Sequence, residues 1–318
     1  MKKYYITTPI YYVNDKPHIG HAYTTILADT LSRFRTLIGE QSFFLTGLDE
    51  HGLKVQQAAE KNKVTPEVHC DTMAPAFIEL WEKLNINYSD FIRTTEKRHT
   101  TIVQSILSQV YENGDIYQDE YEGWYSISEE RFITEKEVES GLFGEAKKIK
   151  EKNYFFKMSK YQSELIKKIE SDELSIQPKS RKNEVLGFLK QELSDLCISR
   201  PKSRLEWGIE IPFDKDYVTY VWFDALINYI SAPKYSEDNK NFELHWPADV
   251  HLIGKDILTT HSVYWPTMLI SLNLPMPKAI FAHGWWLTDD EKMSKSLGNV
   301  INPLMLIDEF GVDPVRYY

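Results

Sequence analysis

The hydrophobic pattern at the start of the chain alternates between strand and helix. Residues 3–10 are rich in β-branched and aromatic side chains, which predicts a strand. Apolar residues then recur at helical spacing across 27–38, and Gly39 stands where a helix would end. Residues 42–46 again have the pattern of a strand, and 53–61 that of a helix. This order predicts an α/β fold, a doubly wound parallel sheet with helices on both faces.

The same alternation returns after residue 217. It predicts strands over 218–222, 250–253 and 279–287, and helices over 223–231 and 256–272. Pro266 is expected to kink the second of these helices, because proline lacks the N–H that a helix interior needs. Asn302 followed by Pro303 predicts a further helix start, with asparagine as the cap and proline in the first turn.

The stretch between these two halves has a different character. From 116 to 212 the charge density is higher and the hydrophobic spacing is less regular, which we interpret as an inserted domain with a small core of its own. The predicted division is 1–115 for the first half of the α/β domain, 116–212 for the insertion, 213–297 for the second half and 298–318 for a third piece.

Composition and charge limit the kinds of protein this can be. The 318 residues carry a formal charge of −10, which argues against nucleic-acid binding over the whole surface. No apolar run approaches the roughly 18 residues of a membrane span, and no signal peptide is predicted after Lys2 and Lys3. Cys70 and Cys197 form no C-x-x-C pair, which excludes a disulfide framework and a four-cysteine zinc site. We therefore expect a cytoplasmic protein with no membrane partner.

A histidine pair follows the first predicted strand. His18-Ile19-Gly20-His21 places two imidazoles three residues apart, on one face of the opening turn of a helix. The free N–H groups of a helix start attract anions, and Gly20 leaves room for a ligand against the backbone. The segment is a candidate phosphate site, and the alternative is a pair of histidines that only cap the helix.

A second candidate segment, Lys292-Met293-Ser294-Lys295-Ser296-Leu297-Gly298, follows the last predicted strand and a polar turn. Its two lysines are three residues apart and flanked by hydroxyls and a glycine. Lysines on such a loop suit phosphate groups whose charge grows during a reaction. On these residues alone, an ordinary solvated loop is the competing interpretation.

Together and in this order, the two segments resemble the signature pair of the class I aminoacyl-tRNA synthetases. The resemblance covers the whole chain, and it is closest to the methionyl-tRNA synthetase family. The stretches that carry this closer match are Thr7-Thr8-Pro9-Ile10-Tyr11-Tyr12, Thr46-Gly47-Leu48-Asp49-Glu50-His51-Gly52, Arg93-Thr94-Thr95-Glu96, Tyr220-Val221-Trp222-Phe223-Asp224-Ala225, and Gly254-Lys255-Asp256 with His261 and Trp265. The resemblance implies a Rossmann-like catalytic domain that joins L-methionine to ATP, releases pyrophosphate and passes methionine to its tRNA.

The resemblance also implies an ATP site. His18 and His21 would be catalytic and would stabilise the triphosphate, while Gly20 would pack against the adenine. Gly254 and Asp256 lie just past a predicted strand end, beside the expected position of the ribose and the bound amino acid. Doubly wound sheets bind their ligands at such strand ends.

The lysine loop completes the implied catalytic set. Lys295 would bind ATP and follow the leaving pyrophosphate, and Lys292 would support it. Mg²⁺ is expected with ATP, because the reacting species is a nucleoside triphosphate.

The implied methionine pocket combines one carboxylate with aromatic and apolar walls. Asp49 would pair with the substrate ammonium, although Asp49-Glu50-His51 is also a candidate helix cap, and Asp49 could serve both purposes. Sulfur–aromatic contacts favour methionine in such a pocket. The other residues expected around it are Ile10, Tyr12, Trp222, Ala225, Tyr229, Ile257 and His261.

The insertion departs from its zinc-bearing relatives. Ser126 and Glu129 stand where a Cys-x-x-Cys pair would fall, and 139–147 contains neither cysteine nor histidine. Because a structural zinc needs about four such ligands, we expect no metal site. The side chains expected to fill the zinc position are Trp124, Tyr125 and Phe132.

The tRNA is expected to meet this chain through its acceptor end. The basic segments 147–152 and 179–182 are candidates for contacts with acceptor phosphates, although phosphate contacts position a nucleic acid without identifying it. No segment up to Tyr318 resembles an anticodon reader, so we expect a catalytic body without the anticodon-binding domain.

Three alternatives remain at the level of the sequence. Class I synthetases for leucine, isoleucine or valine usually carry a much larger insertion, and the enzyme for cysteine needs zinc ligands that are missing here. A nucleotidyltransferase with the same histidine signature would usually be shorter and would lack the aromatic pocket. A non-catalytic RNA-binding relative would be expected to lose Lys295 or a signature histidine.

Overall fold

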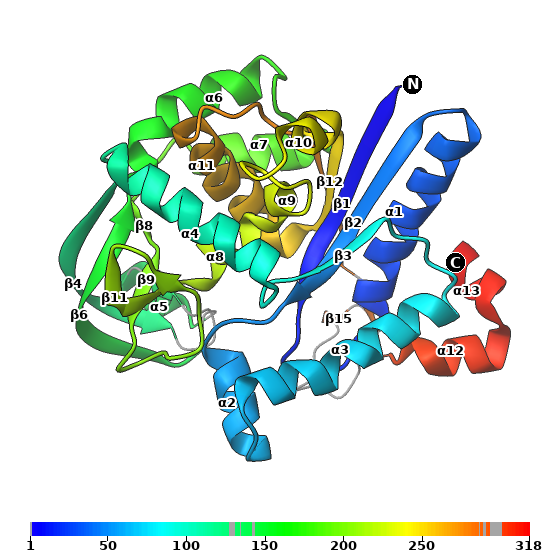
Figure 1. Ribbon diagram of the computed structural model, residues 1–318, viewed down its shortest axis with the longest axis horizontal. Helices are drawn as coiled ribbons and strands as arrows, with labels where there is room; N and C mark the ends of the chain where they lie inside the picture. Colours follow the sequence, from blue (N-terminus) through cyan, green and yellow to red (C-terminus); the bar gives the residue numbers. More distant parts are fainter. Residues whose placement is uncertain are drawn as a thin grey trace.

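A six-stranded parallel sheet forms the centre of the molecule (Figure 1). The computed structural model describes residues 2–126, 131–133, 135–141, 144–285, 287–288, 291–292 and 301–318. Every neighbouring pair of strands in this sheet is parallel, which confirms the predicted α/β fold. In spatial order the strands are β3 (Asp90–Arg93), β2 (Gln41–Asp49), β1 (Lys3–Tyr12), β12 (Val250–Gly254), β13 (Ala279–His283) and β7 (Ser175–Gln177).

Both faces of the sheet are buried, as near-continuous apolar strands predict. Tyr4 and Ile6 of β1 share a cluster with Ala28 of a helix on one face, whereas Tyr5 belongs to the core on the other face. Figure 1 shows α1 on one side of the sheet and α4, α9 and α11 on the other. The bounds of these helices are α1 (Ile19–Leu37), α4 (Lys97–Glu112), α9 (Asn228–Ser231) and α11 (Trp265–Ser271).

The last helices lie against the outer edge of this domain. Ile301, Leu304 and Ile307 pack on the cluster that contains Trp81. The Asn302 side chain accepts the N–H of Leu304 at 3.0 Å, which confirms the predicted helix start. The helices outside the insertion not yet named are α2 (Leu53–Asn62), α3 (Pro66–Lys83), α8 (Val221–Leu226), α10 (Asn239–His245), α12 (Pro303–Phe310) and α13 (Val312–Tyr317).

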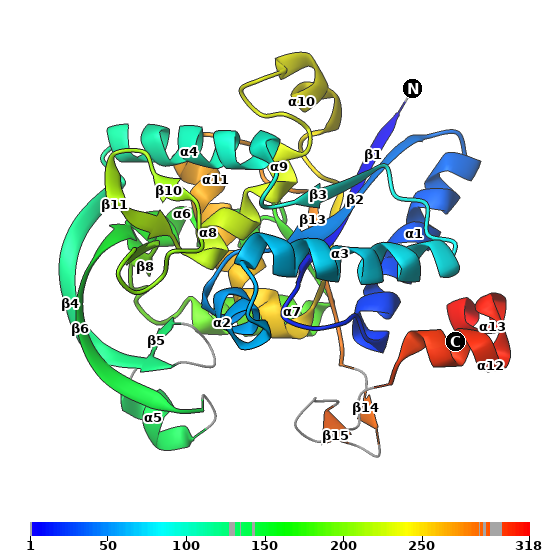
Figure 2. The same cartoon turned by 60° about the horizontal axis from the view of Figure 1, so that its bottom comes forward.

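The central stretch forms a long curved hairpin that extends away from the parallel sheet (Figure 2). In spatial order its antiparallel sheet contains β5 (Arg131–Ile133), β4 (Ile116–Ser126), β6 (Ala146–Phe156) and β8 (Leu196–Cys197). The helical elements of this stretch are α5 (Glu135–Ser140), η1 (Met158–Tyr161), α6 (Gln162–Glu170) and α7 (Lys179–Phe188).

In the described residues, this stretch shares a buried core with the parallel sheet, in place of the separate core that its pattern predicts. Phe156 and Leu165 belong to the same buried cluster as Leu45 of the parallel sheet. In addition, β7 lies within 116–212 and pairs with β13, so one of its strands completes the main sheet. The four domain boundaries themselves stay predictions.

Two of the predicted strands end earlier than expected. The strand predicted over 218–222 is β11 (Asp214–Thr219), which pairs antiparallel with β9 (Ser199–Pro201) and β10 (Glu210–Ile211). Tyr220 is already the N-cap of α8, because a short apolar run fits a buried helix as well as a strand. The strand predicted over 279–287 ends at His283, and a small hairpin of β14 (Leu287–Thr288) and β15 (Glu291–Lys292) follows it.

The two helices predicted in the second half are both irregular. The one over 223–231 is divided into α8 and α9 at Ile227. The one over 256–272 begins as a 3₁₀ turn, η2 (Lys255–Ile257), and passes through a π-helical turn, η3 (Thr260–Tyr264), before α11. Pro266 stands directly after this π turn and cannot donate the next helical hydrogen bond, which accounts for the irregularity at the predicted place.

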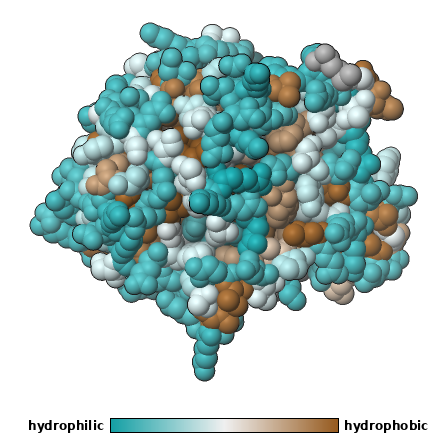
Figure 3. All heavy atoms as spheres, viewed as in Figure 1, coloured by the Kyte–Doolittle hydropathy of each residue, from teal (hydrophilic) through white to brown (hydrophobic). Residues whose placement is uncertain are grey.

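The face shown in Figure 3 is mainly hydrophilic, with small separate hydrophobic patches. In the part of the chain that the structure describes, no helix combines the length and the apolar character needed to cross a membrane.

Candidate active site

A cavity of about 520 Å³ opens at the carboxyl ends of β1, β2, β12 and β13. Parallel doubly wound sheets bind their ligands at this edge. The five residues predicted for ATP outside the lysine loop and the eight predicted for methionine all line this one cavity. They are His18, Gly20, His21, Gly254 and Asp256, and Ile10, Tyr12, Asp49, Trp222, Ala225, Tyr229, Ile257 and His261. The structure brings these residues together, and their individual roles stay predictions.

The two predicted lysines fall wholly or partly outside the described residues. Lys295 lies outside the described residues. Lys292 is paired with Leu287 in the β14–β15 hairpin, and its side chain is also outside the described part. Their proximity to the cavity therefore stays a prediction.

The histidine pair caps α1 through both of its rings. The Gly20 N–H donates to His18 Nδ1 at 3.1 Å, and the His18 N–H donates to His21 Nδ1 at 3.1 Å. The rings stack with their centroids 3.8 Å apart. A nitrogen that accepts an amide N–H carries no proton, so each neutral ring must carry its proton on Nε2. Both histidines therefore cap the helix and, when neutral, carry their protons on Nε2, while their role toward phosphate stays a prediction.

Gly20 has a second role that the sequence did not reveal. A Cβ at this position would lie 2.9 Å from His18 Cε1 and 3.1 Å from His18 Nδ1. Any side chain here would push the His18 ring out of its capping position. The glycine is therefore required by the cap itself, whether or not a ligand packs over it.

A similar close approach occurs where β12 ends. A Cβ on Gly254 would lie 2.5 Å from Asp256 Oδ1. The absence of that side chain lets the Asp256 carboxylate fold back over the end of the strand. Asp256 itself is exposed to solvent at the edge of the cavity.

The predicted methionine end of the cavity is buried and internally hydrogen-bonded. The Ile257 carbonyl accepts from His261 Nδ1 at 2.9 Å, so His261 Nε2 must accept from the Tyr229 hydroxyl at 2.7 Å. Burial lowers the pKa of His261 to about 4, against smaller opposing effects of the Ile257 carbonyl and Asp256. Burial also raises the pKa of the Tyr229 hydroxyl. Both groups are therefore neutral near pH 7.

Asp49 ends β2, directly opposite Tyr12 of β1 in the parallel register. It lines the cavity and is only 6% exposed. The N-cap of α2 is Gly52 at φ 105°, and no side chain caps this helix. The expectation that Asp49 also serves as a helix cap is therefore wrong, because the chain makes a glycine turn between the strand and the helix.

Several lining residues were missed by the sequence analysis. Lys54 brings a positive charge from the first turn of α2. Trp285 also lines the cavity, and the Lys255 ammonium lies 3.6 Å from its ring centroid, a cation–π contact. Asn228 is 1% exposed and donates from Nδ2 to the Ala225 carbonyl at 2.6 Å. Trp285 could have been found from the strand-end rule, because it lies just past β13.

A family model confirms what this geometry suggests. The model described as tRNA synthetases class I (M) matches residues 4–142 and 139–318. The chain belongs to this family of class I synthetases. Among its relatives, methionine–tRNA ligase of Clostridium acetobutylicum is 53% identical and that of Bacillus subtilis is 48% identical, over 100% and 99% of this chain. The chain spans about half the length of these relatives, 50% in each case.

Solved structures of this synthetase family give the same result. Mycobacterium tuberculosis methionyl-tRNA synthetase in complex with methionyl-adenylate superposes with a TM-score of 0.95 at 42% identity. This chain is covered completely, together with 64% of that protein. The apo form of the M. tuberculosis enzyme gives a TM-score of 0.82 at 37% identity, with 100% and 61% of the two chains covered.

In the insertion, lysines of both predicted basic segments form ion pairs with nearby carboxylates. Lys148 and Lys150 on β6 lie 3.5 and 3.1 Å from Glu122 and Glu120 on β4. In the second basic segment, Lys182 lies 2.7 Å from Asp172. Neighbouring carboxylates therefore offset much of the charge that was predicted to meet acceptor phosphates.

The predicted zinc-free knuckle falls partly outside the described residues. Ser126 is buried at the end of β4, whereas Glu129 and the Tyr125 and Phe132 side chains are outside the described part. Trp124 pairs with Ile133 between β4 and β5. Within the described ranges no group of three or more His, Cys, Asp or Glu residues is placed to hold a metal ion. The absence of zinc stays a prediction.

Proposed function

We propose that this chain activates L-methionine with ATP, forming methionyl-adenylate and pyrophosphate, and then transfers methionine to its tRNA. One observation carries the proposal. Residues chosen from separate stretches between Ile10 and His261 for ATP and for methionine converge on one cavity at the carboxyl ends of four parallel strands. The relatives are named as methionine–tRNA ligases, which supports methionine as the amino acid substrate.

The proposed reaction places methionine at the buried end of the cavity. Asp49 pairs with its ammonium, and the walls that include Trp222 and Tyr229 surround its thioether. One methionine carboxylate oxygen attacks the α-phosphorus of ATP. A carboxylate–phosphorus bond forms, the bond between the α-phosphorus and the bridging oxygen breaks, and pyrophosphate leaves with that oxygen.

The histidine pair acts at the other end in this proposal. Because both Nδ1 atoms accept backbone N–H groups, the neutral rings of His18 and His21 carry their protons on Nε2, the atoms that this proposal directs at the triphosphate. Donors directed at oxygens whose charge grows in the transition state accelerate the step. Lys292 and Lys295 add positive charge as pyrophosphate departs.

Mg²⁺ would arrive bound to the triphosphate. Among the described residues, the acidic side chains that line the cavity are Asp49 and Asp256, which this proposal assigns to the ammonium and the ribose. Phosphate oxygens and water are the ligands that Mg²⁺ usually keeps in nucleotide sites, and its charge would lower the repulsion between the triphosphate and its attacker.

The proposal extends to the partner and the location. The tRNA would present its acceptor end to the cavity once the adenylate has formed, in the cytoplasm. The residues assigned to the first step all belong to this chain, so the adenylate should form in the absence of tRNA.

The test is ATP–pyrophosphate exchange with each of the twenty amino acids in turn. Exchange with methionine alone is the expected result. Exchange with leucine, isoleucine, valine or cysteine would favour another class I specificity. Exchange with none of the amino acids would contradict the proposal and favour a nucleotidyltransferase or a non-catalytic relative.

A further inference from the structure

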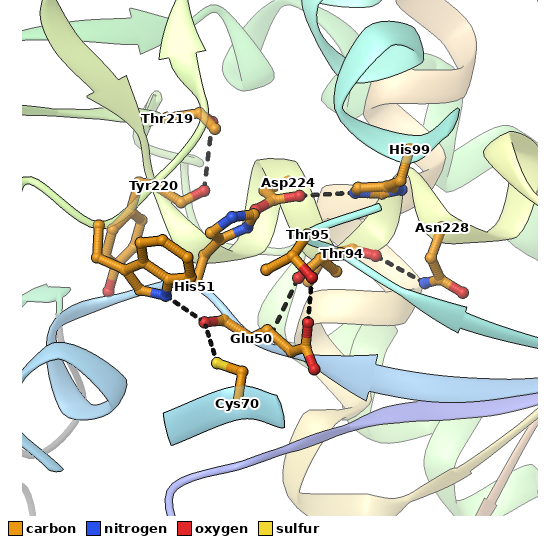
Figure 4. A network of polar contacts seen from close by, with 12 residues as sticks. Glu50, His51, Cys70, Thr94, Thr95, His99, Thr219, Tyr220, Asp224 and Asn228 are labelled. Carbon is orange, nitrogen blue, oxygen red and sulfur yellow. Dashed lines mark hydrogen bonds and ion pairs between the residues drawn. The ribbon is translucent and has the colours of Figure 1, made fainter. Parts of the chain in front are cut away.

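A buried carboxylate outside the cavity joins two imidazoles from different parts of the fold (Figure 4). Asp224 of α8 is completely buried. Its Oδ2 lies 2.6 Å from His51 Nδ1, and its Oδ1 lies 2.7 Å from His99 Nε2. Burial alone would raise the pKa of Asp224, but the contacts with His51 and His99 outweigh it and lower the pKa to about 2. Asp224 is therefore an ionised acceptor, and each imidazole donates one N–H to it.

The arrangement on the far side of His99 extends this network. His99 Nδ1 lies 2.7 Å from the Ser231 hydroxyl. Since Nε2 donates to Asp224, Nδ1 of a neutral His99 accepts from Ser231. Ser231 is in α9, two residues after Tyr229. One carboxylate thus joins the start of α2, the helix α4 and the α8–α9 segment.

None of the three network residues lines the cavity, but each is close in sequence to residues that do. His51 follows Asp49 by two residues, and Asp224 lies between Trp222 and Ala225. Asp49 ends β2 and Trp222 lies in α8, so two different elements contribute them to the lining of the cavity. The short contact between His51 and Asp224 is a direct polar link between the segments that carry these two residues.

Glu50, between Asp49 and His51, connects this segment to the end of β3. Glu50 is completely buried, its Oε1 accepts from Arg93 Nε at 2.7 Å, and its Oε2 accepts from the Thr95 hydroxyl. The Glu50 N–H donates to Thr94 Oγ1 at 3.0 Å. Arg93, Thr94 and Thr95 all lie at the end of β3. Glu50 thus attaches this segment to β3, and His51 gives it a hydrogen bond to α8.

We propose that Asp224 is a positioning residue that holds Asp49 and Trp222 at the separation that methionine requires, acting through His51 and His99. This inference rests on the proposed function. A carboxylate satisfies two N–H donors with its two oxygens. An asparagine amide offers one oxygen and one NH₂ group, and the NH₂ group would face an imidazole N–H. The neutral amide must therefore lose one of the two links or force a histidine into its other tautomer.

The main test compares kinetics of the whole chain and its Asp224→Asn variant in methionine-dependent ATP–pyrophosphate exchange. Misplacement of a substrate-binding group by a distant change can cost about 10²-fold, so we expect the KM for methionine to rise roughly 10- to 100-fold. The KM for ATP and kcat at saturating methionine should change little, because the lost interaction is with bound methionine in both ground and transition states.

Asp29→Asn is the matched control. Asp29 is also completely buried, and its carboxylate accepts from Arg33 at 2.7 Å, from Arg316 at 2.5 Å and from the Asn87 N–H at 2.8 Å. It does not line the cavity. This variant should lower the melting temperature and leave the KM for methionine unchanged, which separates general destabilisation from positioning.

A second pair of variants keeps the test decisive if Asp224→Asn does not fold. His51→Asn retains an N–H near the position of Nδ1, and His51→Leu removes it. The KM for methionine should be higher in His51→Leu than in His51→Asn. Equal values in the two variants, or an unchanged KM in a folded Asp224→Asn, would overturn the inference. An equal rise in the KM values for methionine and ATP would do the same.

The parent chain distinguishes this inference from the proposed function. If the parent does not exchange with methionine, the proposed function fails and this inference fails with it. If the parent exchanges normally and Asp224→Asn retains the parent KM for methionine, only the positioning role of Asp224 is wrong.

Discussion

The two ends of the cavity are built on different physical principles. At the proposed methionine end, Tyr229 and His261 are 1% and 2% exposed, and their polar atoms are hydrogen-bonded to the protein. At the proposed phosphate end, His18 and His21 are half-buried and Asp256 is exposed. The first end has a geometry fixed by packing before any ligand binds. The second presents N–H donors at a helix start, where added negative charge is stabilised. Changes at the first end should therefore affect binding, and changes at the second should affect rate.

Replacement of Asp49 tests the binding end most strongly. Asp49→Asn keeps the shape of the side chain and removes its charge, so the substrate ammonium would enter a largely apolar pocket without a counter-ion. We expect methionine binding to weaken by roughly 3–5 kcal/mol, measured by equilibrium binding. ATP binding by the same variant is the control and should be retained. Methionine affinity within about threefold of the parent would remove Asp49 from the site.

Two replacements of His18 separate its cap from its proposed catalytic donor. His18→Ala should cost about 1 kcal/mol of stability through loss of the N-cap, and His18→Asn should restore that cap. Both variants lose the Nε2–H, so single-turnover adenylate formation should slow by about 10²–10³-fold in each. A parent-like rate in His18→Asn would show that the histidine is a cap only.

Buried His261 should make the stability of the folded chain sensitive to acid. His261 has a pKa of about 4 in the folded chain, below its ordinary value of 6.5, chiefly because of burial. The unfolded chain therefore takes up this proton first as the pH falls. Stability should decrease between about pH 6.5 and pH 4 by roughly 1–3 kcal/mol on this account.

Denaturant unfolding across that pH range measures the effect. His261→Gln should show a shallower decline than the parent. The decline should not vanish, because burial also lowers the pKa of His251 well below its ordinary value. A parallel pH profile in the variant would show that His261 does not cause the acid sensitivity.

Metal removal should have the smallest effect. The purified chain is expected to contain no stoichiometric zinc, and a chelator should leave its melting temperature unchanged, since bound structural zinc would contribute folding energy. Elemental analysis is the direct measurement. One zinc per chain would show that residues near the tip of the β4–β6 hairpin supply ligands that the sequence pattern does not reveal.

The local sequence pattern was sufficient where a structural rule depends on neighbours in the chain. The helix start at Asn302 and the disturbance near Pro266 both follow from backbone hydrogen bonding within one turn. The prediction of a strand over 218–222 was wrong because it depended on packing between parts of the chain that are distant in sequence. Whether a short apolar run becomes strand or helix depends on which surface buries it, and here Tyr220 already begins a helix.

The sequence by itself determined the α/β class, which rests on the periodicity of short stretches. Its resemblance to family motifs also indicated thirteen of the residues that line the cavity. Only the tertiary structure decided that β7 completes the parallel sheet and that His51, His99 and Asp224 meet around one carboxylate. His51 and Asp224 are separated by 173 positions. Their contact exists because the turn after β2 packs against α8, which follows a strand of the separate antiparallel sheet. No local pattern records which buried donors will then face the same acceptor.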